Sequence, residues 1–314
     1  MHPALSVIVF TTASGAGYGL LALLGLLSSA SWLPADRWLG VSAIAIALTL
    51  ITGGLLASTA HLGRPERAWR AFSQWRSSWL SREGVMSLLS YVPALAFAGL
   101  WFAGSGGAAV AVAGLATTLL AIATVYCTAM IYASLKPIHQ WHNAWVPAGY
   151  LALSLMSGAV WLNALLLTWG AQRPAIAVLA AAAIVLAWWV KLRAWRYADT
   201  TRSPSTPESA TGLGSRGKVR LFEAPHTEDN YLLQEMGYRI ARKHAAKLRR
   251  IAVALAFVAP LVLTVLTLAV DGAAAFVAAA LAVPLVMIGL LVERWLFFAE
   301  AKHTVTLYYG AETV

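Results

Sequence analysis

The feature that most constrains this chain is a series of long apolar runs, each about 20 residues. As an α-helix, such a run crosses a hydrocarbon core of roughly 30 Å. Lipid offers no partners to backbone N–H and C=O groups, so a crossing segment must satisfy them internally, as a helix does. The chain is therefore predicted to be a single domain over 1–314, an all-α integral membrane protein with a bundle of about eight transmembrane helices. The expected spans are 4–27, 38–60, 84–104, 107–134, 146–168, 173–195, 250–270 and 274–299.

The composition agrees with this fold class. Of 314 residues, 60% are hydrophobic and only 11% are charged, whereas a soluble domain carries roughly 25% charged residues. The first residues, Met1-His2-Pro3, lack the basic region of a cleaved signal peptide, and the apolar run that follows is long enough to span.

The basic residues indicate the topology. Among 23 lysines and arginines, only Arg37 and Arg173 belong to the face with short connections. Loops rich in Lys and Arg stay in the cytoplasm. Both termini and the long connections, near 61–83, 135–145 and 196–249, are therefore predicted to be cytoplasmic. Topology also explains the net charge of +10, so no nucleic-acid partner is expected.

The loop at about 196–249 has two parts. Residues 199–228 contain Ser-Pro, Thr-Pro and Gly and predict an irregular linker, whereas 228–250 has apolar residues at helix spacing and many cations. Such a helix is typical of one lying on anionic lipid head groups. It is also suited to docking a cytoplasmic partner, and the two roles are compatible.

All seven histidines fall on or near the predicted cytoplasmic face: His2, His61, His139, His142, His226, His244 and His303. A transmembrane b-type cytochrome needs facing axial ligands within its helices. This distribution argues against two haems, while one haem near the cytoplasmic side stays open. The single cysteine, Cys127, cannot hold an iron–sulfur cluster and is predicted to be a buried core residue.

The densest polar cluster is the first long loop. His61 ends one predicted helix and Glu83 begins the next, with Trp69, Trp75 and Trp79 nearby. A quinone head group needs an aromatic slot and donors that pass protons, and His titrates near neutral pH. The pattern is consistent with a quinone site. The alternative is ordinary anchoring, because Trp and Arg gather at membrane interfaces and a His often caps a helix end.

Two further clusters are weaker candidates. His139 and His142 lie three apart and would share a face if helical, where they would anchor the interface or line part of the quinone pocket. Two histidines without a nearby carboxylate indicate no metal site. Glu293 is deep enough in the last span to be costly unpaired, so it is a functional candidate. Pairing with Arg294 or with an arginine of another helix is the structural alternative.

These residues resemble a known family. The segment His61-Leu-Gly-Arg-Pro-Glu-Arg-Ala-Trp-Arg-Ala, followed by Ser78-Trp-Leu-Ser-Arg-Glu83, is similar to the membrane-anchor subunit of DMSO reductase (DmsC-type). The ending Glu300-Ala-Lys-His-Thr-Val-Thr-Leu-Tyr-Tyr-Gly fits the same family. With eight expected helices and a similar length, the resemblance covers nearly the whole chain.

The resemblance implies a role as the anchor of a molybdopterin enzyme. An iron–sulfur subunit would dock on the anchor and connect it to a molybdopterin catalytic subunit. The anchor itself would carry no haem or iron–sulfur cluster and would exchange electrons with ubiquinone or menaquinone. His61 and Glu83 match residues implicated in quinol binding, with Trp79 beside them, and Arg64 would orient the ring or a partner. No residue of this chain would perform the substrate chemistry.

One departure points to a subfamily. In DMSO reductase the catalytic subunits and this loop face the periplasm, whereas the arginine-rich loops here predict the opposite. The stretch Leu232-Leu-Gln-Glu-Met-Gly-Tyr-Arg-Ile-Ala-Arg-Lys-His looks more like the membrane subunit of the cytoplasmic sulfite dehydrogenase (quinone). The resemblance thus implies a bacterial inner-membrane complex in which partners oxidise sulfite and electrons reach ubiquinone. The anchor of a DMSO or other oxyanion reductase that draws electrons from quinol is the alternative.

Two other classes remain. A transporter should carry charges along a path through the helix middles, often in repeated halves, but the sequence has few such charges and no convincing repeat. A purely structural anchor without a quinone site is the second, and substitution of His61 would separate it from a quinone-reactive one.

Overall fold

The computed structural model describes residues 1–314 except 1–2, 61, 105–106, 224–227, 229 and 237–239. The described residues form an all-α bundle with eight helices long and apolar enough to cross a membrane, which confirms the predicted fold class. The spans are α1 (Leu5–Ser29), α2 (Arg37–Thr59), α3 (Trp79–Phe102), α4 (Ala108–Ala133), α5 (Trp145–Thr168), α6 (Pro174–Thr200), a seventh span (His244–Leu266) and α11 (Gly272–Ala299).

The seventh span is composite and begins at His244, whereas the sequence predicted a start near residue 250. It combines most of α9 (Ile240–Val253) with the π-helical turn η3 (Ala254–Val258) and α10 (Ala259–Leu266). Pro260 lacks an N–H and crowds the carbonyl of Ala256, which accounts for the widened turn. Within the predicted cationic helix at 228–250, the part from Ile240 onward is therefore continuous with the membrane-spanning part, whereas residues 237–239 lie outside the described residues.

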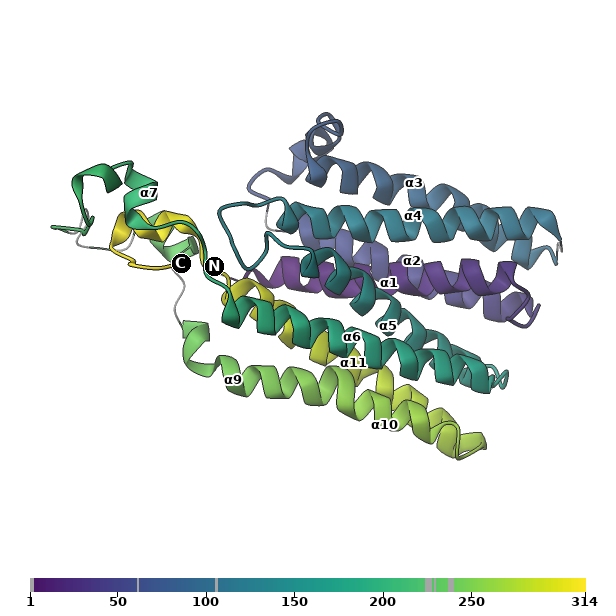
Figure 1. The fold of residues 1–314 in the computed structure, drawn as a ribbon. Helices are drawn as coiled ribbons and strands as arrows, with labels where there is room; N and C mark the ends of the chain where they lie inside the picture. The colour runs from purple at the N-terminus through teal and green to yellow at the C-terminus, as the bar shows by residue number, and fades with distance from the viewer. Residues whose placement is uncertain (1–2, 61, 105–106, 224–227, 229, 237–239) are drawn as a thin grey trace.

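The remaining elements are short. They are η1 (Pro65–Phe72), α7 (Pro207–Thr211), η2 (Gly214–Arg216), α8 (Tyr231–Met236) and η4 (Thr304–Tyr309). Most of these project beyond one end of the bundle, where Figure 1 also shows both termini. We call this end the terminal face. The short connections lie at the opposite end, as the sequence predicted.

The centre of the bundle is α1 and α5. In each, 78% of the apolar window is buried, against 28–44% in the other spans. Figure 1 shows α3 and α4 along one edge and α9 with α10 along the other. The other helices pack around this central pair.

Small residues allow the central helices to meet. A Cβ on Gly19 would overlap the backbone of Ser154 in α5, and one on Gly158 would overlap Gly19. The close approach thus depends on the missing side chain of Gly19. At Gly15, four residues earlier, a Cβ would have open space, and the carbonyl accepts a hydrogen bond from Ser154 Oγ at 2.6 Å.

Candidate functional site

Glu83 lies in the first turn and a half of α3, whose N-terminus is capped by the Ser78 side chain. Its side chain is buried, with a fractional exposure of 5%. Thr128 Oγ1 of α4 donates a hydrogen bond to Glu83 Oε1 at 2.5 Å. In the described part of the chain no cation pairs with this carboxyl group. A buried carboxyl held only by a neutral hydroxyl is costly as an anion, which marks Glu83 as a functional candidate.

Trp79 lies one helical turn before Glu83 and is held on two sides. Its ring packs edge-on against Tyr126 of α4, with centroids 6.0 Å apart. The Arg82 guanidinium lies over the same ring at 4.3 Å and donates hydrogen bonds to the carbonyls of Trp75 and Arg76. The indole next to Glu83 is therefore oriented before any ligand binds.

The rest of the first loop approaches α3 through η1. The ring of Phe72 packs so closely on Gly84 that a Cβ there would lie 2.9 Å from it. Arg64 precedes η1 and is exposed at the surface. His61 lies outside the described residues. Of the predicted site residues, the structure thus places Glu83 and Trp79 one turn apart on α3, both against α4, and Arg64 at the surface.

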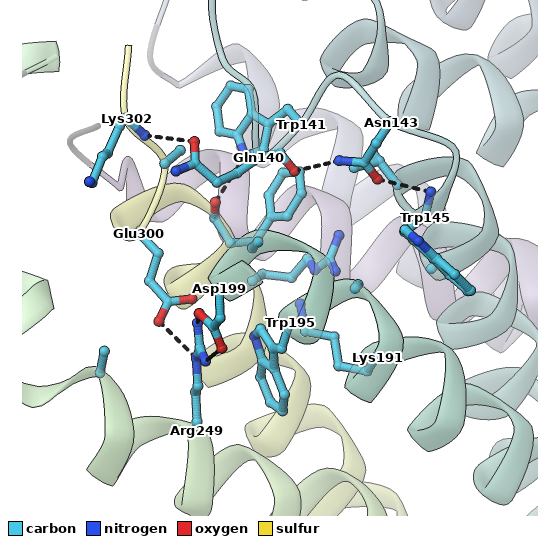
Figure 2. A pocket seen from close by; sticks show the side chains of 18 of the residues that line it. Gln140, Trp141, Asn143, Trp145, Lys191, Trp195, Asp199, Arg249, Glu300 and Lys302 are labelled. Carbon is cyan, nitrogen blue, oxygen red and sulfur yellow. Dashed lines mark hydrogen bonds and ion pairs between the residues drawn. The ribbon is translucent and has the colours of Figure 1, made fainter. Parts of the chain in front are cut away.

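A large cavity, of about 800 Å³, lies at the terminal face between α5, α6, α9 and α11 (Figure 2). Aromatic side chains form much of its wall: Trp141, Trp145, Tyr150, Trp195 and Phe297. Its volume lies within the range of small-molecule pockets, roughly 300–1,000 Å³. This cavity was not predicted, because it is formed by four segments far apart in the sequence.

Beside the large cavity lie three buried charges, which we call the ion cluster, and two of them, Lys191 and Arg294, line the cavity. Glu293 of α11 is fully buried and forms ion pairs with Lys191 of α6 and Arg294 of its own helix. Lys191 and Arg294 are also buried. The structural alternative for Glu293 is thus confirmed, with a lysine of another helix in place of an arginine. Two cations share one carboxylate, so Glu293 is held as an anion.

The rim of the large cavity is held by Arg249 of α9. Figure 2 shows its guanidinium between Asp199 at the end of α6 and Glu300 just after α11. Two hydrogen bonds of 2.7 and 3.0 Å reach the Asp199 carboxylate, and one of 2.9 Å reaches Glu300. These bonds join the cationic helix to the two other helices that flank the cavity.

The two histidines of the second predicted cluster have separate partners. The segment between α4 and α5 is a series of turns rather than a helix, so they do not share a helical face. His139 Nε2 bonds with Thr201 Oγ1 at 2.8 Å, and His142 Nδ1 bonds with the Ala133 carbonyl at 2.6 Å. Burial, together with the nearby His142, lowers the pKa of His139.

This cluster does form a pocket wall, but through the neighbours of its histidines: Gln140, Trp141, Asn143 and Trp145. Trp141 Nε1 donates to the Phe297 carbonyl at 3.0 Å, which fixes the segment on α11. The pocket it lines is the large cavity. Glu83 and Trp79 do not line that cavity.

Sequence reasoning missed Thr128 and Lys191. Thr128 carries no signal, because threonines are common in apolar helices, and its partner Glu83 is 45 residues away. Lys191 did carry a signal in the sequence, because it lies nine residues before the end of α6, between apolar neighbours. A charge so placed is rare without a partner.

Comparison with known proteins bears on the whole chain. Residues 1–310 match the model of the DMSO reductase anchor subunit (DmsC) family. The chain is also 35% identical to a sulfite dehydrogenase subunit of Allochromatium vinosum, over 98% of this chain and 99% of that protein. This multi-pass membrane protein therefore belongs to the DMSO reductase anchor subunit (DmsC) family, the membrane anchors of oxidoreductase complexes.

Proposed function

We propose that this chain is the quinone-reactive anchor of a molybdopterin and iron–sulfur oxidoreductase, with the quinone head group bound beside Glu83. The observation that carries the proposal is the buried Glu83 carboxyl, held by the neutral Thr128 hydroxyl with no cation partner among the described residues. Such a group is free to gain and lose a proton, which quinone chemistry requires.

The residues around Glu83 fit a quinone. Trp79 supplies an aromatic face already fixed by Tyr126 and Arg82. Glu83 holds or moves a proton at its carboxyl oxygen, and His61 is its proposed partner in the relay. Arg64, exposed before η1, orients the ring or a partner subunit. A bound quinone accepts two electrons and two protons to become a quinol.

The proposed partners follow from the family and from the relative. An iron–sulfur subunit docks over the first loop and receives electrons from a molybdopterin subunit that oxidises sulfite to sulfate. Electrons leave to ubiquinone in a bacterial inner membrane, with the terminal face in the cytoplasm. The concentration of Lys and Arg on that face supports this orientation.

The test is the substitution His61→Ala in the complex purified with its partners. We expect quinone-linked sulfite oxidation to fall by about 100-fold or more, because the relay loses a titrating group. Oxidation with a water-soluble artificial acceptor, which takes electrons from the partner subunits, reports whether the complex is assembled. His244→Ala serves as the matched control. His244 is exposed on α9, lies outside the first loop and does not line the large cavity.

Loss of both activities in His61→Ala would show a structural role instead. Unchanged quinone turnover would remove His61 from the site. A chain that purifies alone, without molybdenum and non-haem iron, would overturn the proposal as a whole.

A further inference from the structure

The large cavity shares a wall with a second, smaller one. This small cavity, of about 30 Å³, lies between α1, α4, α5 and α11. Tyr150 of α5 and Arg294 of α11 line both cavities. The Arg294 guanidinium lies 4.4 Å over the Tyr150 ring. These two side chains, which both cavities have in common, therefore stand between them.

The far side of the small cavity reaches the Glu83 site. Thr128, whose hydroxyl donates to the Glu83 carboxyl, is one of its lining residues. The same hydroxyl keeps a lone pair that can accept a hydrogen bond from the cavity. The small cavity thus connects the wall of the large cavity with the direct hydrogen-bond partner of Glu83.

The small cavity is lined mostly by apolar surface, but several hydroxyl groups also line it and it has room for water. A water molecule needs about 10–15 Å³ of such space and two to four polar partners, so this cavity accommodates one or two. Three buried hydroxyls line it: that of Thr12 has no hydrogen-bond partner within the described residues, and those of Tyr18 and Tyr150 have only loose contacts, with Ser87 and Ser90 and with Arg294 respectively. Together with Thr128 they offer the bonds that a bridging water requires.

The groups along this line lie at one depth in the bundle. Glu83, Thr128, Tyr150 and Arg294 each lie about five residues from the terminal-face end of their helix, or roughly 8 Å along its axis. Apolar helices rarely carry polar groups in register across several neighbours, because each costs free energy in lipid. Their alignment forms a polar layer across the bundle.

We propose that this polar layer is a proton path between the large cavity and Glu83. The inference rests on the proposed function, in which a quinone beside Glu83 takes up two electrons from the iron–sulfur partner and two protons. The path supplies protons to Glu83 from water at the terminal face, which enters through the large cavity (Figure 2).

The transfer proceeds by exchange of hydrogen bonds. Thr128 passes its proton to the Glu83 carboxylate and takes one from water in the small cavity. That water takes a proton from the Tyr150 hydroxyl in the same exchange, and Tyr150 takes one from water in the large cavity, so every carrier returns to its starting state. Arg294 does not release its proton, so its role is to position Tyr150. Its charge is partly offset by Glu293, which it shares with Lys191.

The test removes single hydroxyls along the path while keeping shape, by Thr128→Val and Tyr150→Phe. The matched control is Thr124→Val, one turn away on α4. Thr124 is equally buried, its hydroxyl donates to the Leu120 carbonyl of its own helix, and it lines neither cavity. All variants are made in the full complex with its partners.

The first readout needs no quinone. Infrared spectra follow how fast the Glu83 carboxyl band shifts on transfer from H₂O to D₂O, at a pH where the wild type shows the band, with Glu83→Gln identifying it. We expect exchange at least about tenfold slower in Thr128→Val and Tyr150→Phe. Thr124→Val should exchange as the wild type does.

The second readout is quinone turnover, which also decides the matter if the carboxyl band is too weak to follow. We expect kcat with a soluble ubiquinone analogue to fall by about tenfold, with KM nearly unchanged and a larger solvent isotope effect. Wild-type turnover in both path variants would overturn the path and mean that protons reach Glu83 from the first loop. Failure of the proposed function looks different, since the wild-type complex would then reduce no quinone.

Discussion

Glu83 and Glu293 are carboxyls buried at similar depths near the same face of one bundle, and they have opposite surroundings. Glu293 lies between two cations, Lys191 and Arg294, which line the large cavity. Glu83 has a neutral hydroxyl, Thr128, as its described partner. In low-dielectric surroundings a paired carboxylate stays charged, whereas an unpaired one is free to change its protonation state.

This difference assigns the two groups different tasks. The ion cluster holds α6 to α11 and gives the large cavity a rigid wall. The Glu83 region, between α3, α4 and the first loop, is where we propose a proton-exchanging group at the edge of the bundle. Burial alone therefore does not distinguish the two carboxyls, and the charge of their neighbours does.

The largest effect on stability is expected for Glu293→Gln. The change leaves Lys191 and Arg294 buried without an anion, which costs about 3–5 kcal/mol of unfolding free energy. Thermal unfolding in detergent, followed by intrinsic fluorescence, should show a clearly lower Tm. A melting curve like that of the wild type would show that the cations find other partners. Glu293 would then not differ from Glu83 in its contribution to stability.

Glu83→Gln should have the opposite profile. The amide oxygen still accepts the Thr128 hydrogen bond, so the unfolding free energy changes by less than about 1 kcal/mol. Quinone turnover should fall by about 100-fold or more, because an amide cannot exchange the proton. The same melting assay and a quinone assay on the purified complex check both parts. A large drop in Tm with retained turnover would reverse the roles assigned to the two carboxyls.

The smallest effect is expected for Lys191→Met. Here Glu293 keeps Arg294, so a neutral buried pair remains, and a flexible apolar side chain replaces a buried ammonium. We expect a change in unfolding free energy of about 1 kcal/mol or less. A loss of unfolding free energy as large as that of Glu293→Gln would show that the ion cluster needs both cations. Glu83 should then be compared with all three charges of the ion cluster together.

The eight spans were predictable because crossing lipid requires an apolar helix of a set length, whatever its neighbours are. Glu83 and Glu293 were also visible, because a carboxyl near or within an apolar run is unusual. The difference between the surroundings of these two carboxyls could not be predicted from the sequence. The partners that distinguish them, Thr128 and Lys191, lie 45 residues and about 100 residues away along the chain.

The second histidine cluster shows the same limit at short range. Spacing three apart predicts a shared face only if the segment is helical, and between α4 and α5 it turns instead. His139 therefore bonds to Thr201 after α6, and His142 bonds back to α4. The wall of the large cavity is formed by residues between and beside them, such as Trp141.

By itself the sequence determined that this chain is an eight-span membrane bundle, with its cations gathered at the face of both termini and a histidine and carboxyl flanking the first loop. These are properties of single segments, governed by hydrophobicity and local charge. Only the tertiary structure decided which carboxyl is paired with cations and where the large cavity opens. It also decided which hydroxyls lie between that cavity and Glu83. Such properties depend on distances between side chains of different helices, and packing alone sets those distances.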